Sequence, residues 1–121
     1  MLTATLEYLQ VHGVTTKDCK AYHSASGTNG ICKYWCDDWT TEYKKYYCKM
    51  NSNKLLTTAH EIQEELMNNG PMQVAFLVYS DFTSYESGVY SVSDDASIAG
   101  GHAVKLIGWD YDTDGLLYWI C

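Results

Sequence analysis

A histidine that directly follows two glycines is the residue of this sequence best placed for chemistry. Gly100, Gly101 and His102 begin a stretch to Trp109 in which side chains alternate as they do in a strand. Two residues without a β-carbon allow another backbone or a ligand to come close just before the imidazole. An imidazole changes charge near neutral pH, so a histidine at a strand end can transfer protons. The same pattern also fits a structural histidine whose nitrogens are satisfied, and periodicity alone leaves both interpretations open.

Two helices are predicted from apolar periodicity. Residues 3–12 carry leucines at helical spacing and are followed by a glycine, which commonly ends a helix. Residues 58–69 repeat apolar side chains on one face, and Thr58 with Glu61 matches the capping-box pattern at the start of a helix. This second helix is expected to pack on a sheet formed by the residues that follow it.

The second half of the chain is predicted to form a twisted, mostly antiparallel sheet of about four strands. Residues 72–79 are apolar on both faces apart from Gln73, which is typical of a central strand covered on both sides. The other strands are expected at residues 87–92, 100–109 and 116–121. The last two are expected to form a hairpin with an acidic tip.

Composition narrows the class of protein. The 121 residues, 46% of them hydrophobic, suffice for one domain with a modest core. There are 15 acidic residues against 8 lysines and no arginine, so no basic patch can form and nucleic acid is not an expected partner. No apolar run approaches the roughly 18 residues that cross a bilayer, so no membrane partner is expected either.

Four of the five cysteines lie between Cys19 and Cys48, in a stretch with little periodicity and many turn-forming residues. Residues 14–50 are therefore expected to form an irregular, cysteine-rich lobe. Such a lobe is held together either by disulfides, which form in an oxidising compartment, or by a metal ion.

Two short patterns contain metal-ligand residue types. A zinc site could be formed by Cys19, His23, Cys32 and Cys36. However, a spacing of three residues between the last two cysteines is less usual than the spacing of zinc knuckles. Residues 110–115 match the opening of an EF-hand calcium loop, but Cys121 stands where the loop requires a bidentate glutamate. Neither pattern is compelling, and no metal or other cofactor is expected.

A series of short motifs follows one another along the second half of the chain. These are Asn69-Gly70-Pro71, Val78-Tyr79-Ser80-Asp81-Phe82, Ser87-Gly88-Val89-Tyr90, Gly100-Gly101-His102-Ala103, Leu106-Ile107-Gly108-Trp109 and Tyr118-Trp119. In this order they closely resemble the second half of papain-like cysteine peptidases, in particular the cathepsin B-like branch. The resemblance is specific over residues 61–121 and looser over residues 6–48. It implies an α+β fold: the barrel-like antiparallel half of a papain-type fold, with one packed helix and a disulfide-stapled irregular lobe.

The resemblance also implies roles for individual residues. His102 is expected to be the catalytic histidine. The pocket for the substrate's second residue from the scissile bond is expected to be lined by Ala75, Gly101 and Ala103. Their small size leaves space for a bulky apolar side chain, although both alanines would also fit as close-packed core residues.

The cysteines of the lobe also have counterparts in the family. The resemblance implies that Cys19 bonds to Cys36 and that Cys32 reaches a cysteine outside this chain. The lobe is shorter than the corresponding loop of cathepsin B and lacks its pair of adjacent histidines. Endopeptidase action is therefore expected rather than carboxydipeptidase action.

In the papain mechanism a cysteine thiolate attacks the peptide carbonyl, an imidazolium protonates the leaving amine, and an asparagine orients the ring. No cysteine here stands in the family's nucleophile setting, after Gly-Ser and before Trp or Tyr. The asparagine expected soon after Trp119 would lie beyond Cys121. Residues 1–121 are therefore expected to be a single partial domain that is inactive alone, its partner being the missing cysteine-bearing half of the same protein.

The resemblance implies a lysosomal, vacuolar or secreted peptidase that acts on peptides or proteins. Residues 1–10 lack the features of a signal peptide, so that signal is expected upstream. A half-domain would also expose apolar surface around His102, Trp109 and Trp119, which predicts self-association. Two other functions stay open: a non-catalytic papain-fold homologue that acts as a binding or structural module, and a small stapled binding protein unrelated to peptidases.

Overall fold

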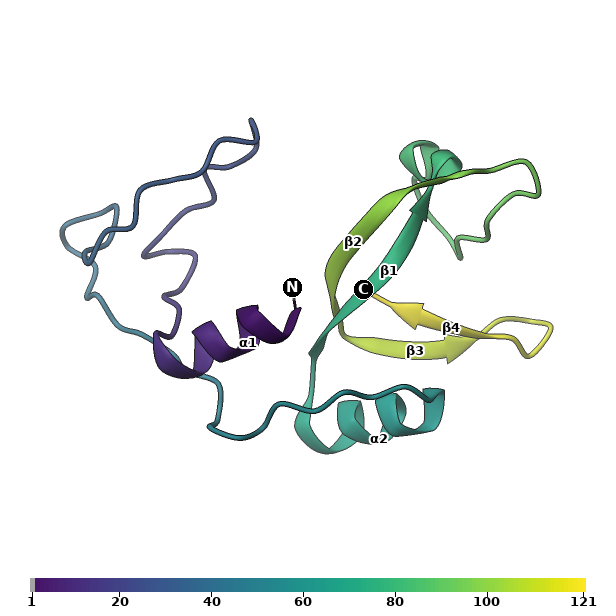
Figure 1. Ribbon diagram of the computed structural model, residues 1–121, viewed down its shortest axis with the longest axis horizontal. Coiled ribbons are helices and arrows are strands. Elements are labelled where there is room, and N and C mark those ends of the chain that lie inside the picture. The colour runs from purple at the N-terminus through teal and green to yellow at the C-terminus, as the bar shows by residue number, and fades with distance from the viewer. Residues whose placement is uncertain (1) are drawn as a thin grey trace. The chain divides into compact units, whose positions relative to one another are not determined.

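The structure of the protein is a computed structural model that describes residues 2–121 (Figure 1). The described chain divides into two compact units, one at residues 3–54 and one at residues 55–121. The first unit contains nearly all of helix α1 (Leu2–Val11) and the irregular stretch after it, and the second contains helix α2 (Ala59–Asn69) and all the strands. None of the helices in the described chain has the length and apolar character needed to span a bilayer.

Helix α1 confirms the helix predicted at residues 3–12. Residues 45–48 donate hydrogen bonds to the free carbonyls at its carboxyl-terminal end. The amide of Cys48 donates to the carbonyl of Leu9 (3.3 Å), and the ammonium of Lys45 donates to the carbonyl of His12 (2.7 Å). Carbonyls at a helix end have no partner within the helix, and a cation there also faces the negative end of the helix dipole. The segment therefore stabilises α1 from outside the helix.

Gly13 allows the chain to turn directly after α1. Its φ is +67°, and a β-carbon at this position would lie 2.8 Å from both the carbonyl oxygen of Tyr46 and the ring of Tyr47. Only glycine fits a left-handed conformation against neighbours this close. The close approach lets Val14 and Tyr46 form an isolated antiparallel bridge.

Apart from that bridge, residues 14–50 form neither helix nor strand. Cys19 and Cys36, the pair that the family resemblance implied, are joined by a disulfide. Both are buried, with exposed fractions of 1% and 2%. The interior of this unit is thus built around the disulfide rather than around regular secondary structure.

Helix α2 begins as its sequence predicts. The Thr58 side chain accepts a hydrogen bond from the amide of Glu61, and the Glu61 carboxylate accepts one from the amide of Thr58, which completes the capping box. The helix ends at Gly70, whose amide donates to the carbonyl of Leu66 (3.0 Å). Leu66 is the buried residue of α2, which lies along β3 (Gly108–Tyr111) in Figure 1 and contacts it.

The strands pair in two antiparallel sheets. Strand β1 (Met72–Tyr79) pairs with β2 (Ile98–Leu106), and β3 pairs with β4 (Leu117–Ile120). The hairpin predicted at the end of the chain is therefore confirmed. The prediction of one sheet of about four strands is wrong, because within residues 2–121 the strands form two separate two-stranded sheets and no closed barrel.

Two strand predictions are wrong in detail, and a third, at residues 87–92, is wrong altogether. Residues 72–79 were expected to be a central strand covered on both faces, but β1 has β2 as its only neighbour among the described residues, and Leu77 is 55% exposed. An apolar run predicts burial on both faces, yet the described chain covers only one of them. The strand expected at residues 100–109 is divided at Ile107 into β2, which pairs with β1, and β3, which pairs with β4.

Residues 87–92 form no strand, because side chains rather than a backbone ladder hold this segment. Gly88 has a φ of +90°, which interrupts an extended run, and its carbonyl accepts a hydrogen bond from the Tyr85 hydroxyl (2.7 Å). The Tyr90 hydroxyl donates to the Asp81 carboxylate (2.5 Å). Alternating apolar residues indicate an extended conformation, but they do not show whether a partner strand is available.

Candidate functional site

The register of β1 against β2 decides which of the predicted site residues share a face. Ala75 lies opposite Ala103, and Leu77 lies opposite Gly101. Because side chains alternate along a strand, these residues share one face of the ribbon. The structure therefore brings Ala75, Gly101 and Ala103 together, and all three are exposed. Within residues 2–121 neither alanine is packed in a core.

His102 lies on the opposite face of the same ribbon, directly across from Phe76. The predicted catalytic residue and the predicted pocket residues thus come from neighbouring positions of β2 but point to opposite sides. His102 is exposed, whereas Leu106, on the same face and further along β2, is only 1% exposed and belongs to the core of this unit. The histidine therefore lies at the open end of a face whose other end is buried.

His102 borders a depression of about 320 Å³. The depression is lined by Val78, Phe82, Ala99, Gly100, Gly101 and His102. A β-carbon built at Gly100 would have no atom within 4 Å, and one at Gly101 would be 3.9 Å from the carbonyl oxygen of Phe76. The space before the imidazole is therefore open, as the two glycines predicted.

The imidazole of His102 makes no hydrogen bond to any other group within residues 2–121. Its one ring contact there is with Phe76, at 5.8 Å between ring centroids and 70° between planes. A histidine kept for structure is normally buried with its ring nitrogens paired. Within residues 2–121 the His102 side chain is instead exposed, with no hydrogen-bond partner for either ring nitrogen.

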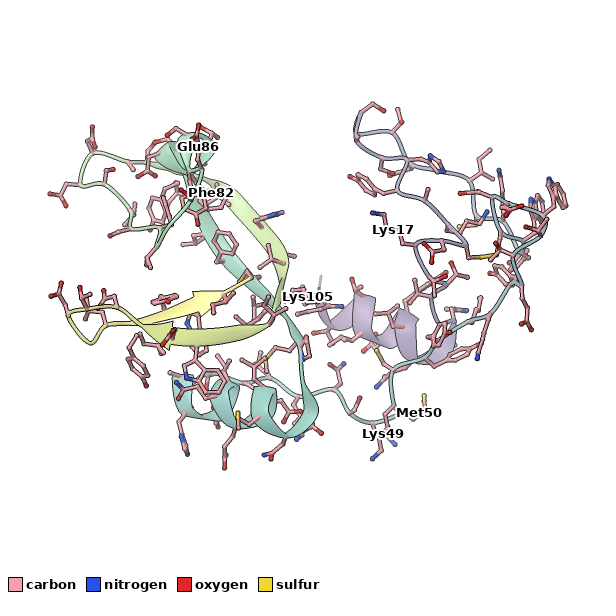
Figure 2. All side chains as sticks on the ribbon, turned by 180° about the vertical axis from the view of Figure 1, so that it is seen from behind. Lys17, Lys49, Met50, Phe82, Glu86 and Lys105 are labelled. Carbon is pink, nitrogen blue, oxygen red and sulfur yellow. A yellow bond between two sulfur atoms is a disulfide. The ribbon has the colours of Figure 1, made fainter. Side chains whose placement is uncertain are left out.

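An aromatic cluster, defined here as Phe76, Phe82, Tyr85 and Tyr90, extends from His102 toward the loop after β1. Phe82, labelled in Figure 2, lies in the short 3-10 helix η1 (Ser80–Ser84) at the end of β1. Its ring contacts Phe76 at 5.5 Å, Tyr85 at 5.7 Å and Tyr90 at 5.0 Å between centroids. Phe82 is therefore the centre of the cluster.

Asp81 anchors the outer end of this cluster. Its carboxylate accepts hydrogen bonds from the hydroxyl of Tyr90 and from the amide and hydroxyl of Ser93, and these bonds hold the pKa of Asp81 below its usual range. Partial burial, followed by the bond to Asp81, raises the pKa of Tyr90 to about 12. Tyr90 thus remains a hydrogen-bond donor throughout the physiological pH range.

Sequence reasoning did not single out the aromatic cluster or its anchor as neighbours of His102. Phe76 and His102 are far apart along the chain, and only the strand register places them opposite each other. The motif Val78-Tyr79-Ser80-Asp81-Phe82 is part of the series that resembles the papain-like peptidases. Nothing in its residue types shows that the carboxylate bonds to Tyr90 and Ser93.

The residues of the alternative zinc site are used in other ways. Cys19 and Cys36 form the disulfide, which leaves neither sulfur as a thiolate ligand. The ring Nε2 of His23 lies 3.1 Å from the Asp37 carboxylate. That contact, together with hydrogen bonds from Lys20 and the amide of Ala21, holds the pKa of Asp37 well below its usual range. The structure therefore does not assemble this set around a metal.

Three cysteines are outside the disulfide: Cys32 and Cys121 are exposed, and Cys48 is half-buried. Partial burial raises the pKa of the Cys121 thiol. A cysteine nucleophile requires the opposite shift, because the thiolate is the reactive form. Cys121 therefore lacks the electrostatic environment of a nucleophile.

The sequence model of a family described as "Papain family cysteine protease" matches residues 1–121, which is the whole chain. The chain belongs to the papain family of cysteine proteases. The resemblance recognised in the motif series around His102 is thereby confirmed, and the alternative of a small stapled binding protein unrelated to peptidases is wrong.

Individual relatives place the chain in the cathepsin B-like part of the papain family. "Cathepsin B-like CP3" of Giardia intestinalis is 38% identical over 120 residues, which cover 98% of this chain and 40% of that protein. "Cathepsin B-like protease 1" of Arabidopsis thaliana is 36% identical over 126 residues, covering 93% of this chain and 32% of that protein. The solved structure "proCathepsin B S9 from Trypanosoma congolense" has a TM-score of 0.75 and 30% identity, covering 97% of this chain and 40% of that one.

The papain-family chain described here therefore spans 40% or less of the length of these three relatives. Its mixed α+β architecture agrees with the solved relative over nearly all of its residues.

Proposed function

We propose that His102 is the general acid and base of a cathepsin B-like cysteine peptidase that hydrolyses peptide bonds in peptides or proteins. The observation that carries the proposal is an exposed imidazole without a hydrogen-bond partner in residues 2–121, on the border of an open depression. Membership of the papain family supplies the reaction class. The cysteine nucleophile and the asparagine that orients the ring are proposed to come from outside residues 1–121.

In this mechanism His102 donates one proton and later removes another. The thiolate adds to the carbonyl carbon of the substrate, and the His102 imidazolium gives its proton to the leaving nitrogen as the C–N bond breaks. The neutral imidazole then removes a proton from water, whose oxygen attacks the thioester carbon. The thiolate departs, and the imidazole has regained its proton. An exposed ring beside backbone that lacks side chains is suited to both transfers.

Ala75, Gly101 and Ala103 are proposed to line the pocket for the second substrate residue from the scissile bond. The register supports this assignment, because it places the two alanines opposite each other with Gly101 beside them on one exposed face. Side chains this small leave room for a bulky apolar group. The pocket face and His102 lie on opposite sides of the ribbon, so a substrate reaching both would cross the strand near the glycines.

The 121-residue chain alone is proposed to be inactive. General acid and base catalysis contributes about 10²- to 10⁴-fold on its own, and without a thiolate no acyl-enzyme forms. We also propose a lysosomal, vacuolar or secreted location. The buried Cys19–Cys36 disulfide supports it, because such bonds persist in oxidising compartments.

Two enzyme assays test this function. The purified chain is expected to show no turnover of a fluorogenic dipeptide substrate beyond the level left by an epoxide thiol inhibitor. In a chimera, the chain replaces the matching stretch of Cathepsin B-like CP3 of Giardia intestinalis, which it covers over 120 residues at 38% identity. The chimera is expected to hydrolyse the substrate, and His102→Ala is expected to reduce kcat by at least about 10³-fold.

The control variant is His60→Ala, which removes an exposed histidine from α2. It should leave turnover unchanged. Retention of activity by the His102→Ala chimera would refute the proposed role of His102. A folded chimera that hydrolyses nothing would favour a non-catalytic module instead.

A further inference from the structure

The Phe76 ring is the one aromatic contact of the His102 imidazole within the described residues. The two residues are directly paired across β1 and β2, so their side chains project side by side from the same face. The ring centroids are 5.8 Å apart and the planes are inclined by 70°. This edge-to-face arrangement is the one that aromatic quadrupoles favour.

No hydrogen bond within residues 2–121 fixes the plane of the His102 ring, and the asparagine proposed to orient it lies outside them, so the Phe76 contact is the restraint that this part of the protein supplies. Rotation about the bond between an sp³ carbon and a planar ring has broad minima, so the exposed imidazole would sample a wide range of orientations. Proton transfer requires the ring nitrogen to face its partner at hydrogen-bond distance. A neighbouring ring packed at a fixed angle restricts that rotation.

Phe76 is itself held in place from the other side. Its ring contacts that of Phe82 at 5.5 Å, with 72° between the planes. Phe82 packs in turn against Tyr90, whose hydroxyl donates to the carboxylate of Asp81. A continuous series of contacts therefore extends from a hydrogen-bonded anchor to the imidazole, and it uses side chains from β1, η1 and the loop after η1.

We propose that Phe76 is a positioning residue, whose ring fixes the plane of the His102 imidazole for proton transfer. The inference rests on the proposed catalytic role of His102, but the contact itself can be tested without any activity. Phe76 touches neither the reacting atoms nor, in this proposal, the substrate. It acts only through His102.

The first test is an NMR measurement on the 121-residue chain. Ring currents from Phe76 are expected to displace the carbon-bound proton resonances of the His102 imidazole from those of His60, an exposed histidine that serves as internal reference. In Phe76→Leu the His102 resonances should move toward the His60 positions, while Phe76→Tyr should keep them displaced. The control Val74→Ala, which removes packing from the same face of β1 but no ring, should leave them in place.

The second test is kinetic and uses the Giardia chimera. Phe76→Leu is expected to lower kcat by about threefold to tenfold, the scale of one edge-to-face ring contact, with KM unchanged. Phe76→Tyr should restore most of kcat, because it retains the ring. Val74→Ala should match the unsubstituted chimera.

The outcomes separate this inference from the proposed function. The positioning role would be overturned if Phe76→Leu left the His102 resonances in place. It would also be overturned if the loss of activity were confined to KM, or if Val74→Ala caused the same loss. Full turnover by His102→Ala would instead refute the function on which it rests. Displaced resonances together with a fall in kcat that tyrosine reverses would establish the positioning role.

Discussion

The Asp81 side chain holds the loop after η1 in place, in a part of the chain whose sequence pattern predicted a strand at residues 87–92. Its carboxylate accepts hydrogen bonds from the Tyr90 hydroxyl and from the amide and hydroxyl of Ser93 (2.9 Å each). Tyr90 lies within the strand predicted at residues 87–92, and Ser93 directly follows it. The same bonds lower the pKa of Asp81, with the Tyr90 hydroxyl as the largest cause.

That pKa shift predicts a pH-dependent contribution of Asp81 to stability. Because its pKa is lower in the folded than in the unfolded chain, the carboxylate stabilises the fold above its unfolded pKa of about 3.9. The contribution is lost as the pH falls through the lower folded value. Asp81→Asn should therefore lower the thermal midpoint by a few degrees at about pH 7, with the difference shrinking toward about pH 2.

Thermal unfolding followed by circular dichroism at both pH values measures this difference. Asp95→Asn is the matched control, because Asp95 is an exposed aspartate of the same loop that makes no side-chain hydrogen bond within residues 2–121. An equal loss of stability at both pH values would contradict the assignment, since it would indicate lost packing rather than a lost charge.

At the scale of elements, helix α2 is the part that its own sequence specifies most completely. Thr58 and Glu61 form the capping box, and the Glu61 carboxylate also accepts the amide of Thr57 (3.2 Å). The Thr58 hydroxyl also donates to the Glu61 carboxylate (2.8 Å), and this bond, followed by those from the amides of Thr57 and Thr58, lowers the pKa of Glu61. All the partners lie within five residues of one another, so no long-range information is needed to predict them.

Removing the amino-terminal cap of α2 should lower the stability of the fold. Thr58→Ala removes the side-chain acceptor for the Glu61 amide and should lower the free energy of unfolding by about 1 kcal/mol. Thr57→Ala is the control, because only the backbone amide of Thr57 takes part. Chemical denaturation of both variants gives the comparison, and equal destabilisation would show that the capping bond is not the cause.

The difference between local and long-range interactions explains which elements could be predicted from the sequence. Both helices and β1 were predicted to within about a residue or two, because periodicity and caps are local properties. The division of the strand after His102 and the missing strand at residues 87–92 depend on pairing partners that are distant in sequence. The site divides in the same way: glycine spacing predicted the open approach to His102, whereas its Phe76 contact follows only from the register.

At the scale of the whole molecule, the two units are stabilised by different means. Residues 55–121 contain paired strands and a face that buries Leu106, whereas residues 3–54 bury Cys19 and Cys36 as their most enclosed side chains. A unit without a sheet has few backbone hydrogen bonds to replace a lost crosslink. The disulfide should therefore matter for the first unit and very little for the second.

Replacing both cysteines with alanine tests this difference. The bond joins residues 17 positions apart, and the chain-entropy estimate for a loop of this size is about 3 kcal/mol. Cys19→Ala/Cys36→Ala should therefore abolish most amide hydrogen-exchange protection in residues 14–50 while β1 and β2 keep theirs, as followed by mass spectrometry. Cys32→Ala, which removes an exposed free thiol from the same stretch, should change neither unit. Equal loss of protection in both units would mean that they unfold together, and the disulfide would then stabilise the candidate site as well as its own unit.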